Sequence, residues 1–308
     1  MTSQSASVAV TQIAGGLALS PLLIGVTQQA KARLQGRRGA GPLQPYRELR
    51  RLWGKSGVDV EGTTFVYRLA PVIVAAAMGA AILLVPIATG APRLGVGQDA
   101  LVLAGLLALS RLAVCIAAWD TSNGFALQGA SRDLTLSVFV EAALVLSLAV
   151  AALVAGTTDL SGVIAGTAGG HLWTTPALAL GGVAFALVIV AETGRQPVDN
   201  PDTHLELTMI YEGPVLEYAG RDQAYLQWAL AARHWVVLVL AAQVFLPHPV
   251  GTWWQLALLP VSLGLLCIAL AVTETVLAKM RILLVPRLIG VGAAVALLGI
   301  VTWLVETA

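Results

Sequence analysis

The chain has 308 residues, of which 57% are hydrophobic and 11% charged, and its mean hydropathy is +0.81. A soluble domain contains about 25% charged residues, so this composition excludes an ordinary soluble protein and indicates an integral membrane protein. The net charge of +1 gives no sign of nucleic-acid binding. Two cysteines, Cys115 and Cys267, are too few to hold an iron–sulfur cluster or a closed zinc site, so we expect this chain alone to bind no cofactor.

Eight apolar runs are each long enough to cross a bilayer as a helix, which needs roughly 20 residues. The runs lack the alternation of a membrane β-barrel, so we expect an all-α polytopic protein with a single membrane domain over residues 1–308. The expected spans are about 8–28, 65–89, 98–119, 134–156, 173–193, 226–246, 253–275 and 284–305. Seven spans are the alternative, if the first run, which Ser20-Pro21 interrupts, lies in the membrane interface.

Positive charges lie almost entirely in alternate connections between these spans. The first connection alone holds eight Lys and Arg residues, whereas Arg93 is the only one on the opposite side. The positive-inside rule therefore predicts that the odd-numbered connections are cytoplasmic and that both termini are outside. The first positive residue, Lys31, follows the first span, so this run lacks the basic start of a signal peptide and is expected to be retained.

The first connection, about residues 31–64, is predicted to contain an amphipathic helix. Tyr46, Leu49 and Trp53 recur there at helical spacing, with charged residues between them. Such a helix either rests among lipid headgroups as an anchor or forms a docking surface for another protein. The candidate docking residues are Arg37, Arg38 and Tyr46.

The fifth connection, about residues 194–225, is acidic and longer than the topology requires, and loops of this length are usually functional or disordered. Seven carboxylates lie between Glu192 and Asp222, together with two Arg and one His, which is the composition of a hydrated, proton-accepting cavity. The candidate residues of this junction loop are Arg195, Asp199, Asp202, His204, Glu206, Glu212 and Glu217. The four His residues of the chain are scattered without metal-binding spacing, so no metal site is expected.

Ionisable side chains within spans are candidate functional residues, because a charge at the bilayer centre costs at least about 2.5–3.5 kcal/mol on insertion scales. Glu141 lies roughly 12 Å into the fourth span at 1.5 Å per residue. Glu192 closes the fifth span, Glu274 closes the seventh, and Arg111 lies within the third. Carboxylates in such positions can exchange protons near neutral pH, so the three glutamates, together with Arg111, are candidates for a proton path.

A structural role is the alternative for each of these carboxylates. Glu192 and Glu274 could be boundary residues that reach water, or they could pair with Arg195 and Arg281. Glu141 needs a partner if it is buried, and Arg111 is the only deep candidate.

The fifth connection contains a motif whose elements are Ala191-Glu192, Arg195, Pro197-Val198-Asp199, Glu206-Leu207 and Glu217-Tyr218-Ala219-Gly220. This motif resembles that of the subunit 1 (H-type) family of respiratory complex I and its relatives in the membrane-bound [NiFe] hydrogenases. Two further segments agree, one of Ala32 to Arg37 with Gly41-Pro42 and Gln44-Pro45-Tyr46, the other of Glu274 with Lys279-Met280-Arg281 and Pro286-Arg287. The resemblance covers most of the chain and implies a fold like that of complex I subunit 1.

Residues 129–133 point to one branch of this family. They read Gly-Ala-Ser-Arg-Asp, which resembles the Gly-Ala-Ser-Arg-Glu element of the hydrogenases more than the Ser-Tyr-Glu element of quinone-reducing complex I, with Asp133 as a small departure. His204 stands where the complex I pattern usually has an acid. The resemblance therefore favours the formate hydrogenlyase and group 4 membrane-bound hydrogenase branch.

The resemblance implies a non-redox subunit of a bacterial or archaeal cell membrane that links electron transfer in a soluble arm to proton or sodium translocation. The implied partners are [NiFe]-hydrogenase-like large and small subunits and an iron–sulfur subunit, which hold the metal centres, and antiporter-like membrane subunits. Arg195, Asp199, Glu206 and Glu217 would shape the junction with the arm. Glu141, Glu192 and Glu274 would begin a polar path into the membrane.

Three alternatives remain open at this stage. One is a proton-translocating NADH:quinone oxidoreductase subunit 1, with part of a quinone site between the first, fifth and sixth spans and the loop. Another is a stand-alone secondary ion transporter that uses the same carboxylates. The third is a scaffold whose acidic residues only bind the soluble arm.

Overall fold

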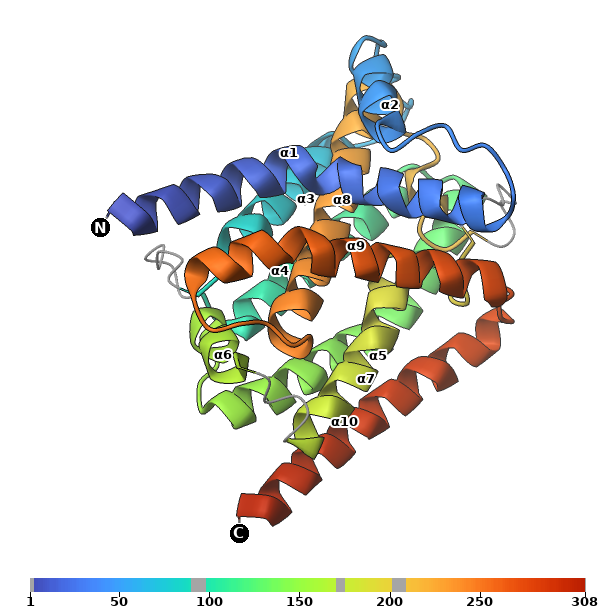
Figure 1. Cartoon of the computed structure of the whole chain (residues 1–308). Helices are drawn as coiled ribbons and strands as arrows, with labels where there is room; N and C mark the ends of the chain where they lie inside the picture. The colour runs from blue at the N-terminus through green and yellow to red at the C-terminus, as the bar shows by residue number, and fades with distance from the viewer. Residues whose placement is uncertain (1–2, 90–97, 170–174, 201–208, 308) are drawn as a thin grey trace.

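The computed structural model describes residues 3–89, 98–169, 175–200 and 209–307, and its regular elements there are helices (Figure 1). In chain order these are α1 (Ser3–Leu34), α2 (Gln44–Trp53), α3 (Phe65–Leu84), α4 (Ala100–Asp120), α5 (Gly124–Ala155), α6 (Leu160–Thr167), α7 (Pro176–Glu192), α8 (Gly220–Leu240), α9 (Thr252–Val276) and α10 (Val285–Thr307). Two 3-10 turns, η2 (Gly213–Val215) and η4 (Ile282–Leu284), and a π-helical turn, η3 (Ala241–Phe245), complete the set. The predicted all-α class is confirmed.

Seven of the described helices are long and apolar enough to cross a membrane, namely α1, α3, α4, α5, α8 with η3, α9 and α10. The remaining expected span corresponds to α7, which is equally apolar but has only 17 residues. Pro21 does not interrupt α1, which is continuous from residue 3 to residue 34. The chain is a multi-pass membrane protein.

Two helices begin earlier than the hydropathy of the chain suggests. Asn123 caps α5, because its side-chain oxygen accepts hydrogen bonds from the N–H groups of Phe125 and Ala126. Arg132 and Asp133, expected in a connection before the fourth span, therefore lie within α5. Likewise, α8 begins at Gly220 rather than near residue 226, so the fifth connection is shortened to residues 193–219.

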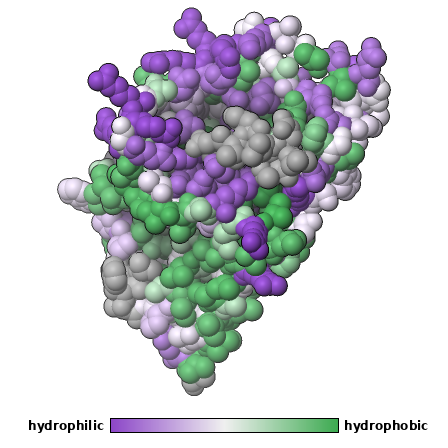
Figure 2. Space-filling view, turned by 90° about the vertical axis from the view of Figure 1, so that its right-hand side faces the viewer, coloured by the Kyte–Doolittle hydropathy of each residue, from purple (hydrophilic) through white to green (hydrophobic). Residues whose placement is uncertain are grey.

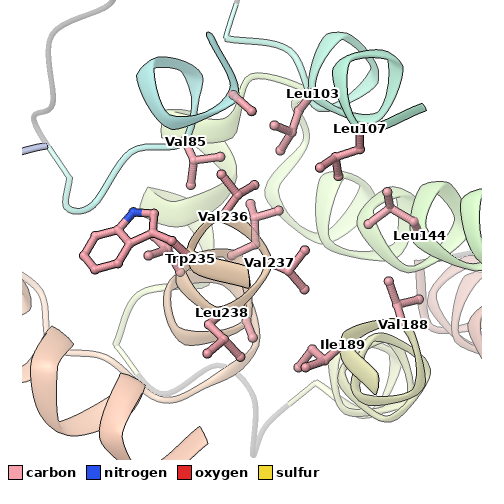
Figure 3. Packing of buried hydrophobic residues seen from close by; sticks show 14 of the residues in the cluster. Val85, Leu103, Leu107, Leu144, Val188, Ile189, Trp235, Val236, Val237 and Leu238 are labelled. Atoms are coloured by element: carbon pink, nitrogen blue, oxygen red, sulfur yellow. The ribbon is translucent and has the colours of Figure 1, made fainter. Parts of the chain in front are cut away.

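α8 is the central helix of the molecule. Of its most apolar 18-residue stretch, 89% is buried inside the chain, compared with 28% for α9 and 22% for α10. Figure 3 shows Val236, Val237 and Leu238 of α8 among side chains from several other helices, including Leu107 of α4 and Val188 of α7. This burial explains how α8 can contain Arg233 and His234, since neither side chain faces the lipid.

The connections between the spans meet at two opposite ends of the bundle. At one end, the Lys279 ammonium pairs with Asp199, and the Met280 N–H donates to the Pro197 carbonyl, 3.0 Å away. We call this end, formed by residues 35–64, 121–123, 193–200, 209–219 and 277–284, the junction face. Figure 2 views the molecule from this side, and hydrophilic residues gather over its upper part. At the other end, the Gly169 N–H donates to the carbonyl of His248.

Candidate functional site

Four buried charges from four elements meet beneath the junction face. Arg111 lies on α4, Asp133 on α5, Glu192 at the end of α7 and Arg233 on α8, and each is at most 8% exposed. Arg111 Nε is 3.4 Å from Asp133 Oδ1, and Arg111 Nη2 is 3.2 Å from Glu192 Oε2. Arg233 donates to the same Glu192 oxygen. We call these four residues the inner charge cluster. Its two cations and two carboxylates balance, which is how buried charge is tolerated.

Further hydrogen bonds fix the two guanidinium groups. Arg233 Nη2 donates to the Leu107 carbonyl, 2.6 Å away, and to the Ser110 hydroxyl, both on α4. The Arg111 guanidinium carbon lies 5.8 Å from the centre of the Tyr211 ring, within the range of a cation–π contact. These contacts hold both guanidinium groups in position toward Glu192, because a guanidinium group fixed by contacts at several of its N–H donors has few other positions.

Tyr211 links the inner charge cluster to the junction loop. Its hydroxyl donates to the Ala191 carbonyl over 2.6 Å, next to Glu192 in the chain. Burial raises the pKa of this phenol well above its ordinary value, so the hydroxyl stays a proton donor under physiological conditions. A displacement of the loop at Tyr211 would therefore act on both Arg111 and the end of α7.

A second group of charges joins α1, the junction loop and α9. Glu274, fully buried near the end of α9, lies 3.0 Å from Arg195 Nη1 and 3.2 Å from Lys31 Nζ. We call these three residues the outer charge cluster. Beside it, Asp199 Oδ1 accepts a hydrogen bond from Lys279 over 2.6 Å. Charged pairs thus fasten the first, fifth and seventh connections to one another.

Asp199 also braces the loop internally. Its second oxygen, Oδ2, accepts hydrogen bonds from the backbone N–H groups of Ile210, at 3.1 Å, and Tyr211, at 3.3 Å. One carboxylate therefore holds the residues that precede and follow the stretch 201–208, and it positions Tyr211 against Arg111.

The segment before α8 is clasped to α3. The rings of Tyr67 and Tyr218 stack with centres 4.3 Å apart, and each hydroxyl donates to a backbone carbonyl across the pair, Tyr218 to Tyr67 and Tyr67 to Glu217. The Glu217 carboxylate accepts a hydrogen bond from Asn123 at the start of α5. Burial raises the pKa of Tyr218, which keeps it a hydrogen-bond donor.

A cavity of about 680 Å³ extends from the inner charge cluster toward α1 and α2. Arg111, Asp133, Glu192 and Arg233 line its inner part. The rest of the wall is mostly apolar and is contributed by α1, α2, α3, α4, the segment 209–218 and α8, including Pro21, Ile24, Leu49, Met78, Leu216 and Leu226. The charged side chains are thus reached through an apolar chamber.

A family model described as NADH dehydrogenase matches residues 7–305 of the chain. The chain belongs to this family. It is 33% identical to formate hydrogenlyase subunit 4 of Escherichia coli K12 over 304 residues, with 93% of this chain and 95% of that protein covered. It is 34% identical to hydrogenase-4 component C of the same organism over 298 residues, covering 94% and 92%. The resemblance to the subunit 1 family drawn from the motifs is confirmed.

A solved structure shares the fold of this NADH dehydrogenase family member. A chain in the structure of the membrane-bound sulfane sulfur reductase, an archaeal respiratory membrane complex, matches with a TM-score of 0.85 at 20% identity, covering 97% of this chain and 99% of that one. The expected fold of complex I subunit 1 type is confirmed. The protein is a membrane subunit of the kind found in respiratory-type complexes.

The structure brings several of the predicted site residues together in the two charge clusters. Arg111 pairs with Asp133 and Glu192, and no ion pair of Arg111 with Glu141 occurs among the described residues. Glu141 lies half-buried on α5, eight residues beyond Asp133. Glu274 pairs with Arg195 and Lys31, whereas the structural alternative considered from the sequence paired Glu192 with Arg195 and Glu274 with Arg281.

The remaining predicted residues fall at the junction face or outside the described chain. Glu212 lines the cavity, and Arg37 and Arg38 are exposed in the turn after α1. Tyr46 on α2 donates a hydrogen bond to the Ala18 carbonyl of α1, and burial raises the pKa of its phenol. The predicted residues Asp202, His204 and Glu206 lie outside the described residues.

Sequence reasoning missed four participants. Asp133 was noted only as a departure from a motif, although Asn123 is a good capping residue whose position would have placed Asp133 in the helix. Arg233 and Lys31 counted only as topology-setting charges. Tyr211 has no signal in a single sequence. Among the described residues, no group of three or more His, Cys, Asp or Glu side chains is arranged to hold a metal ion.

Proposed function

We propose that this chain is the membrane anchor and coupling subunit of a membrane-bound [NiFe]-hydrogenase-type complex. In this role it docks a cytoplasmic arm and links electron transfer in that arm to the translocation of protons or sodium ions. The proposed partners are [NiFe] large and small subunits and an iron–sulfur subunit, which hold the metal centres, and antiporter-like membrane subunits. The chain lies in a bacterial or archaeal cell membrane with its junction face in the cytoplasm and both termini outside.

The observation that supports this proposal is the unbroken series of contacts from the junction loop to the inner charge cluster. Asp199 holds the backbone of Tyr211, Tyr211 lies over Arg111, and Arg111 contacts Glu192. An arm that docks on the loop and changes its charge during electron transfer would act on these contacts directly. Local electrostatic events of this kind can drive a change of protonation elsewhere.

The balance of the inner charge cluster gives the coupling a physical basis. When Asp133 or Glu192 takes up a proton, the cluster gains a net positive charge in a buried place where charges interact strongly. The excess charge would then attract a carboxylate nearby. Glu141 lies about two turns along α5 from Asp133, so it is the next acidic group toward the membrane interior.

Docking of the arm is assigned to the exposed side of the junction face. Arg37 and Arg38 are exposed there, and Tyr46 fastens α2 to α1 beneath them. α2 also packs on α8, with an edge-to-face contact of Trp53 and Tyr225, 5.1 Å between ring centres. A partner bound on α2 would therefore press on the helix that contains Arg233.

The experiment is the Glu141→Gln variant of the assembled complex in proteoliposomes. Glutamine keeps the shape of the side chain but cannot exchange a proton, so we expect hydrogen-dependent reduction of an artificial acceptor to continue while ion translocation falls about tenfold. Glu306→Gln, which changes an exposed residue at the end of α10, is the matched control and should leave translocation intact. Unchanged translocation by an intact Glu141→Gln complex would remove Glu141 from the path.

The apolar chamber favours a second candidate, a quinone-reducing subunit 1. It is long, mostly apolar and ends at polar groups, which are the features of a site for a hydrophobic cofactor with a polar head. A Met78→Trp substitution would fill part of this chamber, and Glu206→Gln would change the loop. Loss of quinone-dependent activity in either variant, with wild-type activity present, would favour this candidate. Hydrogen-dependent reduction of an artificial acceptor without any response to quinone would exclude it.

A further inference from the structure

A separate groove lies on the outside of the bundle, where the end of α1 meets α9. Its volume is about 540 Å³. The residues that line it are Val26, Gln29, Ala30 and Arg33 of α1, Gly39 to Pro42 of the following turn, and Ile268 of α9. Figure 1 shows α1 and α9 running side by side, so the groove opens on their shared outer surface and is distinct from the chamber that leads to the inner charge cluster.

The wall of this groove is built from a turn that lies flat on α1. The Gly41 N–H donates to Gln29 Oε1 over 3.0 Å, and a Cβ added to Gly39 would come within 2.3 Å of the same oxygen. A Cβ added to Gly25 would come within 2.0 Å of the Pro42 carbonyl oxygen. At residue 25 only glycine permits this approach, because the atom that a Cβ would meet belongs to the backbone of Pro42, so the turn lies directly on α1.

The groove divides into an apolar part and a cationic part. Val26, Ala30 and Ile268 form the apolar part, and Ile268 is 49% exposed among the described residues. Arg33 supplies the cation in the last turn of α1, next to the junction face, and it takes part in none of the ion pairs found among the described residues. A ligand that matches both parts has a negatively charged head and a hydrocarbon tail.

The surrounding charge is strongly positive. No acidic residue precedes Glu48 in the sequence, whereas residues 1–47 contain one Lys and four Arg. Of these five cations, Lys31 is already neutralised by Glu274. Basic side chains at the membrane boundary between two helices are the usual receptors for anionic lipid headgroups.

The direction of the two helices places the tail in the membrane. α1 and α9 are parallel, because Lys31 contacts Glu274 while Cys267 Sγ lies 3.7 Å from the Leu23 carbonyl oxygen, farther from the junction face. Exposed apolar side chains continue along both helices in that direction, with Leu19 on α1 and Leu265 on α9. An acyl chain extending from Arg33 would follow these side chains toward the middle of the bilayer.

We propose that this groove binds an anionic phospholipid, with the phosphate at the Arg33 guanidinium and an acyl chain on Val26, Ala30 and Ile268. The lipid fills the seam between α1 and α9 beside the outer charge cluster. It would therefore support the position of Lys31 against Glu274 from the membrane side.

The test uses the full chain, purified in detergent with the subunits that accompany it, delipidated and then followed by native mass spectrometry. The probes are dioleoyl phosphatidylglycerol, dioleoyl phosphatidylcholine and inorganic phosphate. We expect phosphatidylglycerol to bind at least about threefold more tightly than phosphatidylcholine, because of the two lipids only phosphatidylglycerol has a net negative charge. Inorganic phosphate alone should not compete with the lipid.

Four variants assign the binding to this groove. Arg33→Gln should weaken phosphatidylglycerol binding about three- to tenfold, and Arg33→Lys should restore most of it. Ile268→Trp should weaken both lipids because it fills the apolar part. Arg287→Gln removes an exposed guanidinium at the start of α10, away from the groove, and should change nothing. Since Arg33, Ile268 and Arg287 are exposed or half-exposed, the variants should keep their melting temperatures.

Three results would overturn the proposal. The first is equal binding of the two lipids, or an Arg33→Gln variant that binds phosphatidylglycerol as tightly as Arg287→Gln does. The second is competition by inorganic phosphate, which would mean a simple anion site. The third is a photo-cross-link from position 268, in the assembled complex, to another protein subunit instead of to lipid.

Discussion

Glu192 shows how a single residue can determine the state of the whole site. One of its oxygens, Oε2, contacts both Arg111 and Arg233, and the side chain is 1% exposed. When one charge is removed from a buried group of ion pairs, the remaining charges are left without partners. The stability lost in this way exceeds the net stability that the complete group provides. The negative charge of Glu192 therefore stabilises the approach of α4, α7 and α8 in addition to any part it has in ion transfer.

The Glu192→Gln variant tests this charge balance. It leaves two buried guanidinium groups with only Asp133, so we expect a loss of about 3 kcal/mol of stability, seen as a lower melting temperature of the purified protein. The double variant Glu192→Gln with Arg233→Met restores the balance and should recover part of that loss. A double variant less stable than the sum of the two single changes would contradict the argument.

At the scale of elements, the start of α5 is fastened to the segment before α8 by a contact between two glycines. A Cβ on Gly129 would lie 2.8 Å from Gly213 Cα and 2.9 Å from Pro214 Cδ, closer than real side chains approach. The backbone of η2 can rest on α5 only because neither residue has a side chain. This contact helps to hold the clasp of Tyr67 and Tyr218 in place between α3 and α8.

Gly129→Ala should therefore push η2 away from α5. We expect a destabilisation of about 1–3 kcal/mol and faster proteolysis between residues 209 and 219. Gly105→Ala is the matched control, because a Cβ there meets nothing within 4 Å and alanine favours a helix by about 1 kcal/mol over glycine. Equal melting temperatures and equal proteolysis of the two variants would show that the glycine contact has no such role.

The sequence alone predicts elements better than it predicts the partners of charged side chains. Long apolar runs identify the spans, because the bilayer imposes length and composition on each helix separately. The partners of Arg111 depend on which turn of α5 faces α4, and Asp133 lies inside α5 because the capped start of this helix lies ten residues before the start expected from hydropathy. Likewise, Lys31 lies beside Glu274 only because α1 and α9 pack in parallel, which no local pattern encodes.

At the scale of the whole molecule, the buried share of each helix distinguishes a central helix from peripheral helices. α8 is surrounded by other helices, whereas α9 and α10 expose most of their apolar side chains, as helices in contact with lipid or other membrane subunits do. The connections gather at two ends, and the junction face holds nine of the eighteen Lys and Arg residues. The positive-inside rule predicts that this face is cytoplasmic.

Cysteine labelling tests this orientation. Val58 and Val250 are 57% and 76% exposed, the first at the junction face and the second at the opposite end. In intact cells an impermeant maleimide should label a Val250→Cys variant but not a Val58→Cys variant, which should react only after the membrane is opened. The native Cys115 and Cys267 are buried and should give little background. The reverse labelling pattern would invert the predicted topology.

The π-helical turn η3 lies between two contacts made near opposite ends of the molecule, that of Arg233 and that of His248. A turn of this kind contains one residue more than an α-helical turn, so the chain after it is rotated by about 100° and shifted by about 1.5 Å. Beyond η3, His248 Nε2 lies 3.2 Å from the Ile164 carbonyl of α6, while Arg233 on the other side contacts Glu192. The number of residues between Arg233 and His248 is therefore a fixed length of the fold. A deletion within η3 would leave α8 intact. The shortened chain would then keep either the contact of Arg233 with Glu192 or the contact of His248 with Ile164, but not both.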